Sequence, residues 1–259
     1  MRSRKTKQPM GSSSQIRPVM GRQTLGVSVI IPTLNEAANI AHLVLRLRQM
    51  EGVTQVIVCD GGSDDDSVLE AREAGAVVVT ATRNRGAQLN TGANAATGTV
   101  LWFLHADAKP HLHSARSVLR AISQPRRQPI IGGNFRLRFD VATPAARAFE
   151  AIARVQRRLG IYYGDSGIWV QREVFHALGG FRAAPLFEDY DFARRLEAYA
   201  RQHRYRTLRC ALPITVSARR FYQRPWRTLA LWTTLQTLYS MGVPPQRLAQ
   251  FYHWQKKLD

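Results

Sequence analysis

Short apolar runs alternate with longer helix-like stretches over the first half of this 259-residue chain, starting at Gly26. Each run is rich in β-branched residues and too short for a typical helix, which favours a buried parallel strand. The expected strands are Val27–Ile31, Gln55–Cys59, Ala76–Thr80 and Thr99–Leu104, and the expected helices start at Glu36, near Asp65 and near Gly86, with a fourth ending near Ile122. Strands that alternate with helices indicate βαβ units. The sequence therefore predicts an α/β fold with a Rossmann-like, mostly parallel sheet flanked by helices.

The alternation becomes looser beyond Pro129. Apolar and charged residues strictly alternate over Phe135–Phe139, directly after Gly132-Gly133-Asn134, which is typical of a strand with one solvated face. The other expected elements are a helix over Pro144–Leu159, a strand over Ile168–Gln171, and helices over Arg172–Leu178, Asp189–Gln202 and Trp226–Ser240. We therefore expect a later half of the sheet with mixed strand directions, followed by a C-terminal helical region.

The composition of the chain indicates how it is divided into a tail, a folded domain and an extension. Hydrophobic residues make up 45% of the chain, which is enough to bury a full α/β core in one domain. Residues 1–24 mix Arg and Lys with Ser, Gly, Pro and Gln and show no apolar period, so we expect a disordered basic tail. We expect the folded domain over residues 25–220 and a helical extension packed on the same domain over residues 221–259.

The cysteines and the apolar segments indicate a compartment. Two cysteines, Cys59 and Cys210, cannot form a disulfide framework, which favours a reducing environment. No segment approaches about 18 uninterrupted apolar residues, and the basic N-terminus lacks the apolar core of a secretion signal. The sequence therefore predicts a cytoplasmic protein.

The formal net charge of +19 requires an anionic environment, which nucleic acid, acidic lipid headgroups or a phosphorylated substrate would each provide. The chain has no zinc-ligand spacing, helix-turn-helix signature or aromatic RNP-like strand. Nucleic-acid binding would rest on charge alone, and we do not expect it.

His105-Ala106-Asp107 directly follow the apolar run Val100–Leu104. In open α/β sheets, ligands bind just beyond the carboxyl ends of the strands, so Asp107 lies where a metal ion and its phosphates would lie. One carboxylate, a diphosphate and water are sufficient for Mg²⁺ or Mn²⁺. The alternative is an ordinary turn or N-cap residue.

Polar residues also follow the first two expected strands. The first strand is followed by Pro32-Thr33-Leu34-Asn35-Glu36, whose polar groups would hold a nucleotide base or ribose. The alternative is structural: Thr33 or Asn35 caps the next helix, and Glu36 lies in its first turn. Asp60, before Gly61-Gly62-Ser63, would accept hydrogen bonds from ribose hydroxyls or a base edge; the alternative is an Asp-Gly turn.

Two further segments place charges at expected helix starts. Arg85, beside Gly86, would approach a diphosphate, because helix N-termini and guanidinium groups both favour anions; the alternative is a solvated arginine. Glu188-Asp189 would supply a general base beside a phosphate-rich pocket, or would only be partners of the helix dipole.

Taken together, Ile30–Glu36, Asp60-Gly61-Gly62-Ser63, His105-Ala106-Asp107 and Glu188-Asp189 resemble, in order and separation, the motifs of the family 2 glycosyltransferases with the GT-A fold. The resemblance covers about Val27 to Arg220. It implies a nucleotide-diphospho-sugar donor, Mg²⁺ or Mn²⁺ as cofactor, and inversion at the anomeric carbon. The chain departs from the family pattern in two places, because its Asp-x-Asp metal motif begins with His105 and the usual Asp-Asp before Gly-Ser is Cys59-Asp60.

These motifs give a set of candidate site residues. Asp189 is the candidate general base, Glu188 would orient it or bond the acceptor, and Asp165 is its rival. The candidate metal ligands are Asp107 and His105. The candidates for binding the nucleotide sugar are Pro32, Thr33, Asn35, Glu36, Asp60, Arg85, Ala106, Asp107 and Arg219. Arg219 belongs to Ser217–Phe221, which resembles an Arg-plus-aromatic segment of some family members that contacts the diphosphate or acceptor; the alternative is a basic edge strand.

We therefore expect an inverting, metal-dependent glycosyltransferase that acts on an acceptor hydroxyl. The alternatives are a sugar-phosphate nucleotidyltransferase, which ordinarily has a basic glycine-rich loop where this chain has Pro32–Glu36, and a non-catalytic anion-binding module on the same fold. The stretch Trp226–Tyr239 is rich in Trp, Leu and Tyr, and basic residues flank it. It suits an anionic membrane surface and a lipid-linked acceptor, or else forms core or a homodimer contact.

Overall fold

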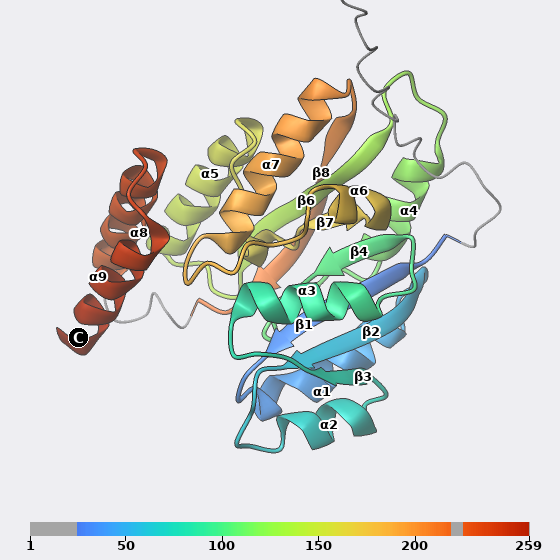
Figure 1. The fold of residues 1–259 in the computed structure, drawn as a ribbon, viewed down its shortest axis with the longest axis horizontal. Coiled ribbons are helices and arrows are strands. Elements are labelled where there is room, and N and C mark those ends of the chain that lie inside the picture. Colours follow the sequence, from blue (N-terminus) through green and yellow to red (C-terminus); the bar gives the residue numbers. More distant parts are fainter. Residues whose placement is uncertain (1–24, 219–224, 259) are drawn as a thin grey trace, which may run out of the picture.

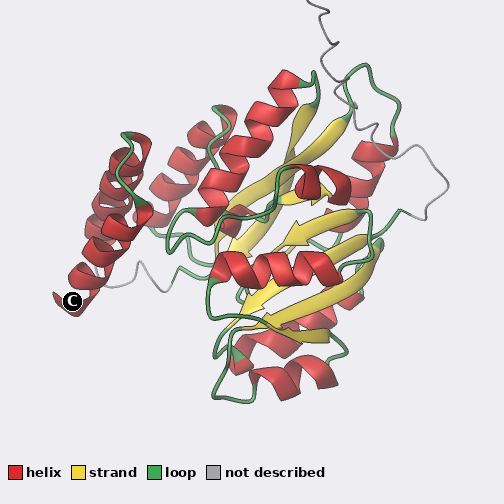
Figure 2. Ribbon diagram, in the orientation of Figure 1, coloured by secondary structure: helices red, strands yellow, loops and turns green. Residues whose placement is uncertain are grey.

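The computed structural model describes residues 25–218 and 225–258, and for residues 225 and 253–258 the backbone alone. Within these residues the chain forms an eight-stranded sheet with helices on both faces (Figures 1 and 2). The predicted tail over residues 1–24 and the candidate Arg219 lie outside the described residues.

The helices and strands predicted between Val27 and Ser240 are all present. The strands are β1 Val27–Thr33, β2 Val53–Asp60, β3 Val77–Thr80, β4 Val100–Phe103, β5 Lys109–Pro110, β6 Ile130–Phe139, β7 Trp169–Gln171 and β8 Arg206–Val216. The helices are α1 Ala37–Arg48, α2 Ser67–Glu73, α3 Arg85–Ala95, α4 Ser114–Ser123, α5 Pro144–Arg158, α6 Arg172–Ala177, α7 Glu188–Gln202, α8 Pro225–Ser240 and α9 Pro245–Leu258, with a 3₁₀ turn, η1, over Gly164–Ser166.

The strand order is β3-β2-β1-β4-β7-β6-β8-β5. Strands β1 to β4 pair in parallel, whereas β7 is antiparallel to both β4 and β6, and β6 pairs in parallel with β8. The carboxyl ends of β1, β2, β3, β4, β6 and β8 therefore lie along one edge of the sheet. The amino end of β7 lies along the same edge because that strand runs in the opposite direction. The predicted mixed later half of the sheet is confirmed.

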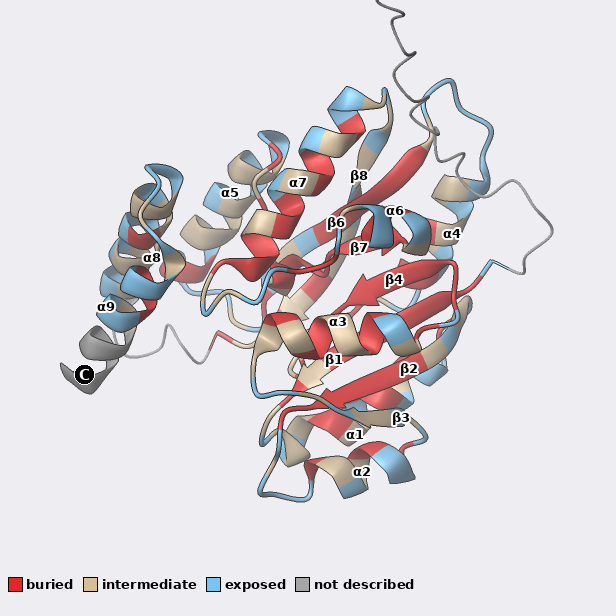
Figure 3. Cartoon of the chain, in the orientation of Figure 1, coloured by how far each residue is buried: buried red, intermediate tan, exposed pale blue. Residues whose placement is uncertain are grey.

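Alternation of buried side chains assigns the helices to the two faces. Val29 and Ile31 of β1 pack in one core cluster, which includes residues of α1, α4 and α5, whereas Ile30 packs in a second cluster with residues of α3, α6 and α7. Strand β4 alternates in the same way, with Trp102 in the first cluster and Phe103 in the second. Because helices cover both faces of the sheet, the side chains on both sides of these strands are apolar, and each strand is a continuous apolar run in the sequence. Figure 3 shows the buried colour concentrated in the sheet and in the inner faces of the helices.

Helices α8 and α9 form a third apolar cluster with the start of α7. Leu235 of α8 and Leu248 of α9 are buried in this cluster beside Phe187 and Tyr190. The aromatic stretch predicted as a helix is thus partly core, although Trp226 at its start is exposed. In the described part of the chain, no helix combines the length and the apolar character needed to cross a membrane.

Three strands differ from the prediction, and the shortest of them, β5, was not predicted because it spans only Lys109–Pro110. Strand β6 begins at Ile130, ahead of the predicted start at Phe135, since Gly132 and Gly133 pair with β7 and so belong to the strand. A side chain at Gly133 would collide with the carbonyl of Leu208, so glycine is required there by close strand approach. Strand β8 was not predicted, because Arg206 and Arg209 interrupt its apolar residues and its later part contains Pro213.

Candidate active site

The carboxyl ends of β1 and β2 bring two predicted residues together. Thr33 and Asp60 are register partners, and both are buried. The Asp60 carboxylate accepts hydrogen bonds from the backbone N–H groups of Gly62 and Ser63, at 2.9 and 3.2 Å, and from the Ser63 hydroxyl at 2.5 Å. The Asp-Gly turn is therefore present, and Asp60 fixes it at the edge where ligands of this fold class bind.

The loop after β1 is held by the loop after β2. Asn35 has a positive φ of 54° and accepts a hydrogen bond from the Asp64 N–H at 2.9 Å. Helix α1 is capped from outside its own loop, because Ser67 Oγ accepts from the Glu36 N–H at 2.7 Å and Asp65 Oδ2 accepts from the Ala37 N–H at 3.1 Å. The alternative interpretation, in which Thr33 or Asn35 caps this helix with Glu36 in its first turn, is wrong, because Glu36 is itself the N-cap residue.

Helix α3 begins at Arg85 and is tied to both strand ends. Gln88 donates from Nε2 to the carbonyl oxygens of Thr33 and Cys59, at 2.9 and 2.8 Å. Asn84 caps the helix by accepting from the Ala87 N–H. Arg85 is therefore presented from the first turn of a helix whose position is fixed against β1 and β2.

The side chain of Arg85 reaches charged partners. Its Nε lies 3.3 Å from Glu188 Oε1, its Nη2 lies 3.9 Å from Asp189 Oδ2, and Nη2 also lies 2.5 Å from His105 Nε2. A guanidinium group has donors only, so His105 accepts through Nε2. The alternative of a freely solvated arginine is wrong, because the side chain is only 34% exposed and is shared among three residues.

Glu188 and Asp189 form the first turn of α7, and both are buried. Asp189 Oδ2 accepts a hydrogen bond from the Gly164 N–H at 2.7 Å. Burial raises the pKa of Glu188 above its ordinary value, the neighbouring Asp189 raises it further, and Arg85 opposes the shift. The helix N-terminus favours negative charge at this position, so the interpretation as helix-dipole partners holds beside the contacts with Arg85.

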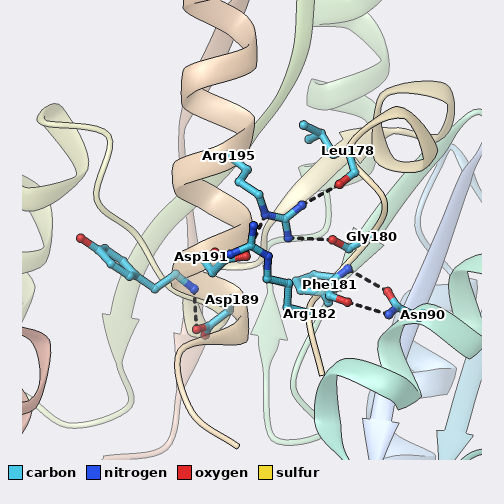
Figure 4. Close-up of polar contacts among 9 residues, drawn as sticks. Asn90, Leu178, Gly180, Phe181, Arg182, Asp189, Asp191 and Arg195 are labelled. Carbon is cyan, nitrogen blue, oxygen red and sulfur yellow. Dashed lines mark hydrogen bonds and ion pairs between the residues drawn. The ribbon is translucent and has the colours of Figure 1, made fainter. Parts of the chain in front are cut away.

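A network of arginines fixes the start of α7 (Figure 4). Asp191 accepts hydrogen bonds from Arg182 Nη1 at 3.0 Å and Arg195 Nε at 2.7 Å. Arg195 also donates to the carbonyl oxygens of Leu178 and Gly180, both at 2.7 Å. Asn90 of α3 exchanges two hydrogen bonds, each 2.8 Å long, with the backbone of Phe181. Residues 178–182 therefore connect α3 to α7, the two helices that carry Arg85 and the carboxylates.

The turn η1 brings Gly164 and Asp165 to the same place. A Cβ atom added to Gly164 would lie 2.5 Å from Arg85 Nη2, 3.0 Å from Asp189 Oδ2 and 3.3 Å from His105 Nε2. These three groups therefore converge on one point of the backbone. Burial, together with the nearby Asp189 carboxylate, raises the pKa of the adjacent Tyr163.

A cavity of about 260 Å³ opens beside this cluster. Of the predicted site residues, it is lined by Arg85, His105, Asp107, Asp165, Glu188 and Asp189. The remaining described candidates, Pro32, Thr33, Asn35, Glu36, Asp60 and Ala106, are not part of its lining. The structure thus brings six candidates from four separate segments to one cavity and leaves the other six described candidates at the neighbouring strand ends.

The cavity also contains residues that the sequence analysis did not single out. Arg157, near the end of α5, donates from Nε to Asn134 Oδ1 at 2.9 Å and from Nη2 to the carbonyl oxygens of Asn134 and Cys210, at 3.0 and 2.7 Å. Burial lowers the pKa of Arg157 to about 10. The only sequence signal was an arginine in a predicted amphipathic helix, which more often indicates a solvated residue.

Comparison with known proteins gives the class of this fold and site. The family model described as Glycosyl transferase family 2 matches residues 28–184, more than half of the chain. The chain therefore belongs to the family 2 glycosyltransferases, which favours glycosyl transfer over the alternative of nucleotidyl transfer. The matched segment ends before Glu188 and Asp189.

Individual relatives are more distant. The chain is 27% identical over 169 residues to Glycosyltransferase AglE from Haloferax volcanii, which covers 60% of this chain and 55% of AglE. It thus spans about half the length of that curated relative. Among solved structures, mannosyltransferase PcManGT from Pyrobaculum calidifontis, in complex with GDP-Man and Mn²⁺, is 20% identical, with a TM-score of 0.61 over 90% of this chain and 69% of the other.

A second solved structure has the same fold. Glucosyl-3-phosphoglycerate synthase from Mycobacterium tuberculosis, in complex with Mn²⁺, UDP and glucosyl-3-phosphoglycerate, is 20% identical with a TM-score of 0.59, over 85% of this chain and 81% of the other. At these identities the likeness shows a shared fold. The predicted GT-A architecture, a mostly parallel sheet flanked by helices, is therefore confirmed.

Proposed function

We propose that this protein transfers a sugar from a nucleotide-diphospho-sugar to an acceptor hydroxyl with inversion at the anomeric carbon, and that Asp189 is the general base. The observation that carries the proposal is the convergence of Arg85, His105 and Asp189 on Gly164 at the cavity. A base and an anion-binding group stand side by side there, as a displacement with a diphosphate leaving group requires.

Asp189 is oriented to accept a proton. Its Oδ2 is held by the Gly164 N–H, and its Oδ1 lies 2.7 Å from the backbone nitrogen of Tyr190, so the carboxylate is fixed between η1 and α7. In a single in-line step, the acceptor oxygen bonds to the anomeric carbon as the bond to the diphosphate breaks. The hydroxyl proton passes to Asp189 during that step. Glu188 then serves to position Arg85 beside the base, and Asp165 is the rival base.

Arg85 serves the leaving diphosphate. It projects from the first turn of α3, and both a helix N-terminus and a guanidinium group attract phosphate oxygens. The same guanidinium forms ion pairs with Glu188 and Asp189. An incoming diphosphate would compete for it, which links occupation of the donor site to the charge state around the base.

A divalent cation fits the donor chemistry of this site. Across residues 25–218 and 225–258, no three His, Cys, Asp or Glu side chains are grouped to hold a metal ion by themselves. A site with few protein ligands suits Mg²⁺ or Mn²⁺ that binds through one or two side chains and the donor's phosphates. Asp107 would hold it, with His105 as a second ligand if Nε2 exchanges Arg85 for the metal. When bound, the cation would neutralise charge that develops on the departing diphosphate.

The nucleoside has a place at the neighbouring strand ends. Thr33 and Asp60 lie at the carboxyl ends of adjacent parallel strands, and Asn35 and Glu36 follow β1. Ligands of α/β sheets bind at such ends. We assign the base and ribose to this edge, with Pro32 and Ala106 as backbone walls and Arg219 as a further contact to the diphosphate or acceptor.

The experiment that tests the reaction is incubation with Mn²⁺ and a panel of nucleotide sugars. Release of a nucleoside diphosphate supports the proposal. In a parallel incubation with nucleoside triphosphates and sugar 1-phosphates, release of pyrophosphate would identify a nucleotidyltransferase. No release in either incubation, with intact nucleotide binding, would identify a non-catalytic anion-binding module. Excess EDTA is the control for metal dependence, and the anomeric configuration of the product reports inversion.

The assignment of the base is tested with Asp189→Asn and, in parallel, Asp165→Asn. We expect Asp189→Asn to lower kcat by roughly a hundredfold or more and to change donor affinity by less than about threefold, since the amide keeps the size of the carboxylate but cannot take the proton. Near-normal turnover of this variant together with a severe loss in Asp165→Asn would transfer the role to Asp165.

The protein's location and assembly also belong to this proposal. The charge of +19 and the exposed Trp226 at the start of α8 support a cytoplasmic enzyme that binds the anionic face of a membrane reversibly. The same helix would serve a homodimer contact if membrane binding is absent. We propose no nucleic-acid partner.

A further inference from the structure

The part of the cavity away from the carboxylates is apolar. It is bounded by β6, α5 and α8, with a lining that includes Phe139, Phe149, Ile152, Ile161, Leu229 and Trp232. The sugar and the diphosphate of a nucleotide-sugar donor are polar, and the nucleoside is assigned above to the ends of β1 and β2, so the donor does not account for this apolar wall. The same cavity is lined by Asp189, so this apolar wall and the proposed base face one continuous space.

Three arginines also line this part of the cavity. They are Arg136 of β6 and Arg154 and Arg157 of α5. In the described part of the chain, none of the three forms an ion pair with a carboxylate. Glu150, which also lines the cavity, accepts a hydrogen bond from the Phe139 N–H at 2.8 Å. The three arginines therefore present positive charge to the cavity that no carboxylate of the described residues pairs with directly.

Arg157 is the best placed of the three to bind an anion. Its Nε and Nη2 donate to neutral oxygens of Asn134 and Cys210, which fixes the plane of the guanidinium. Its Nη1 makes no hydrogen bond with the described residues. Because Nη1 is also absent from the set of fully buried polar atoms that lack a hydrogen-bond partner, this nitrogen is accessible from the cavity. A half-buried, oriented guanidinium with accessible N–H donors matches a phosphate or carboxylate. With its pKa at about 10, the group remains charged at neutral pH.

We propose that this part of the cavity is the acceptor subsite, and that it takes an amphipathic acid. Such an acceptor has a hydroxyl group for Asp189, an apolar body against the wall formed by α5 and α8, and a phosphate or carboxylate on Arg157. The inference rests on the proposed function for the role of Asp189, and it adds the chemical class of the acceptor.

The test is calorimetric titration of the full chain with n-octyl phosphate, compared with inorganic phosphate and n-octanol. Each buried methylene adds about fourfold in affinity, so an apolar wall beside a cation should bind octyl phosphate at least tenfold more tightly than either reference. Octanoate distinguishes the acid groups: comparable binding shows that a carboxylate suffices, and weaker binding that a phosphate is preferred. Octyl phosphate that binds no more tightly than inorganic phosphate or octanol would overturn the proposal.

Matched variants locate the binding on the cavity wall. Ile152 and Val155 are both exposed on α5, but only Ile152 lines the cavity. We expect Ile152→Asn to weaken octyl phosphate binding at least fivefold and Val155→Asn to leave it unchanged. Equal effects of the two substitutions would overturn the assignment to this wall.

A second pair of variants addresses the charge. We expect Arg157→Gln to remove most of the advantage of octyl phosphate over octanol, with Arg158→Gln as the control, since Arg158 is exposed on the same helix outside the cavity. If Arg157→Gln does not fold, Arg154→Gln replaces it, with a smaller loss expected in the same direction. Full retention of the advantage in the folded variant contradicts the proposal.

Failure of this inference is separable from failure of the proposed reaction. Release of nucleoside diphosphate from a nucleotide sugar without preferential binding of octyl phosphate would overturn the acceptor class alone. Octyl phosphate that binds with the expected variant pattern, in a protein that releases no nucleoside diphosphate from any donor, would instead overturn the proposed reaction.

Discussion

Substitution of Gly164 by alanine is the sharpest perturbation that the site offers. The backbone φ of this residue lies outside the left-handed region, so alanine adopts the conformation without strain. The added methyl group enters the point on which three side chains with proposed roles converge, 2.5 Å from Arg85 Nη2 and 3.0 Å from Asp189 Oδ2. No functional group is removed, so any loss of activity reports geometry alone.

The size of the effect follows from these distances. Ordinary van der Waals contact of a Cβ atom begins at about 3.4 Å, so the Arg85 guanidinium must retreat by about 1 Å, and Asp189 must yield a few tenths of an ångström. Misplacement of about 1 Å costs enzymes on the order of a hundredfold in rate, which corresponds to about 2.7 kcal/mol. We expect kcat of Gly164→Ala to fall by roughly that factor.

The assay is continuous measurement of nucleoside diphosphate release, with thermal unfolding and donor titration on the same sample. Overpacking costs about 1–3 kcal/mol of stability, so the variant should still unfold cooperatively. Donor affinity should change by only a few fold. Turnover within about threefold of the parent, in a folded protein, would show that the cluster relaxes without consequence and would refute the argument that its geometry controls the chemistry.

Three further predictions concern charge. Burial raises the pKa of Glu188, so the ionised carboxylate opposes folding, and Glu188→Gln should raise Tm at pH 8. The gain in Tm should fade as the pH falls towards the ordinary glutamate pKa of about 4.3, because the carboxyl group is then protonated in both the folded and the unfolded protein. An equal gain at pH 8 and at that lower pH contradicts the prediction. Asp107→Asn should weaken Mn²⁺-dependent binding of nucleoside diphosphate tenfold or more, about 1.4 kcal/mol, in a titration; identical curves remove Asp107 from the metal site. The protein should sediment with acidic liposomes at low salt and be released by salt, because each surface cation contributes only about 1 kcal/mol and is screened; no preference for liposomes would leave α8 with a packing role.

The sequence predicts best those elements whose secondary structure is decided by a single pattern of apolar residues. Strands β1, β2 and β4 are buried on both faces, so their continuous apolar runs identified them, and the residues that follow parallel strands had to meet at one edge. The convergence of Arg85, His105 and Asp189 required more, since it depends on how residues 178–182 connect α3 and α7. No local pattern encodes that connection.

Other features were hidden because a tertiary partner decides them. The N-cap of α1 is supplied by Ser67 and Asp65 from another loop, which no inspection of Thr33–Glu36 reveals. Arg157 occupies an ordinary helical position, and only the carbonyl oxygens of Asn134 and Cys210 fix its guanidinium in the cavity wall.

The short strand β7 has a consequence for the sheet as a whole. Among the described residues, the ladder between the half that carries Thr33 and Asp60 and the half that carries Arg157's partners passes through three residues, Trp169–Gln171. This strand joins two half-sheets, and its partners on β6, Gly132 and Gly133, contribute no side chain to the joint. Because only this three-residue strand joins the two halves, each half packs mainly against its own helices, and a substitution in one half has few direct routes to the other.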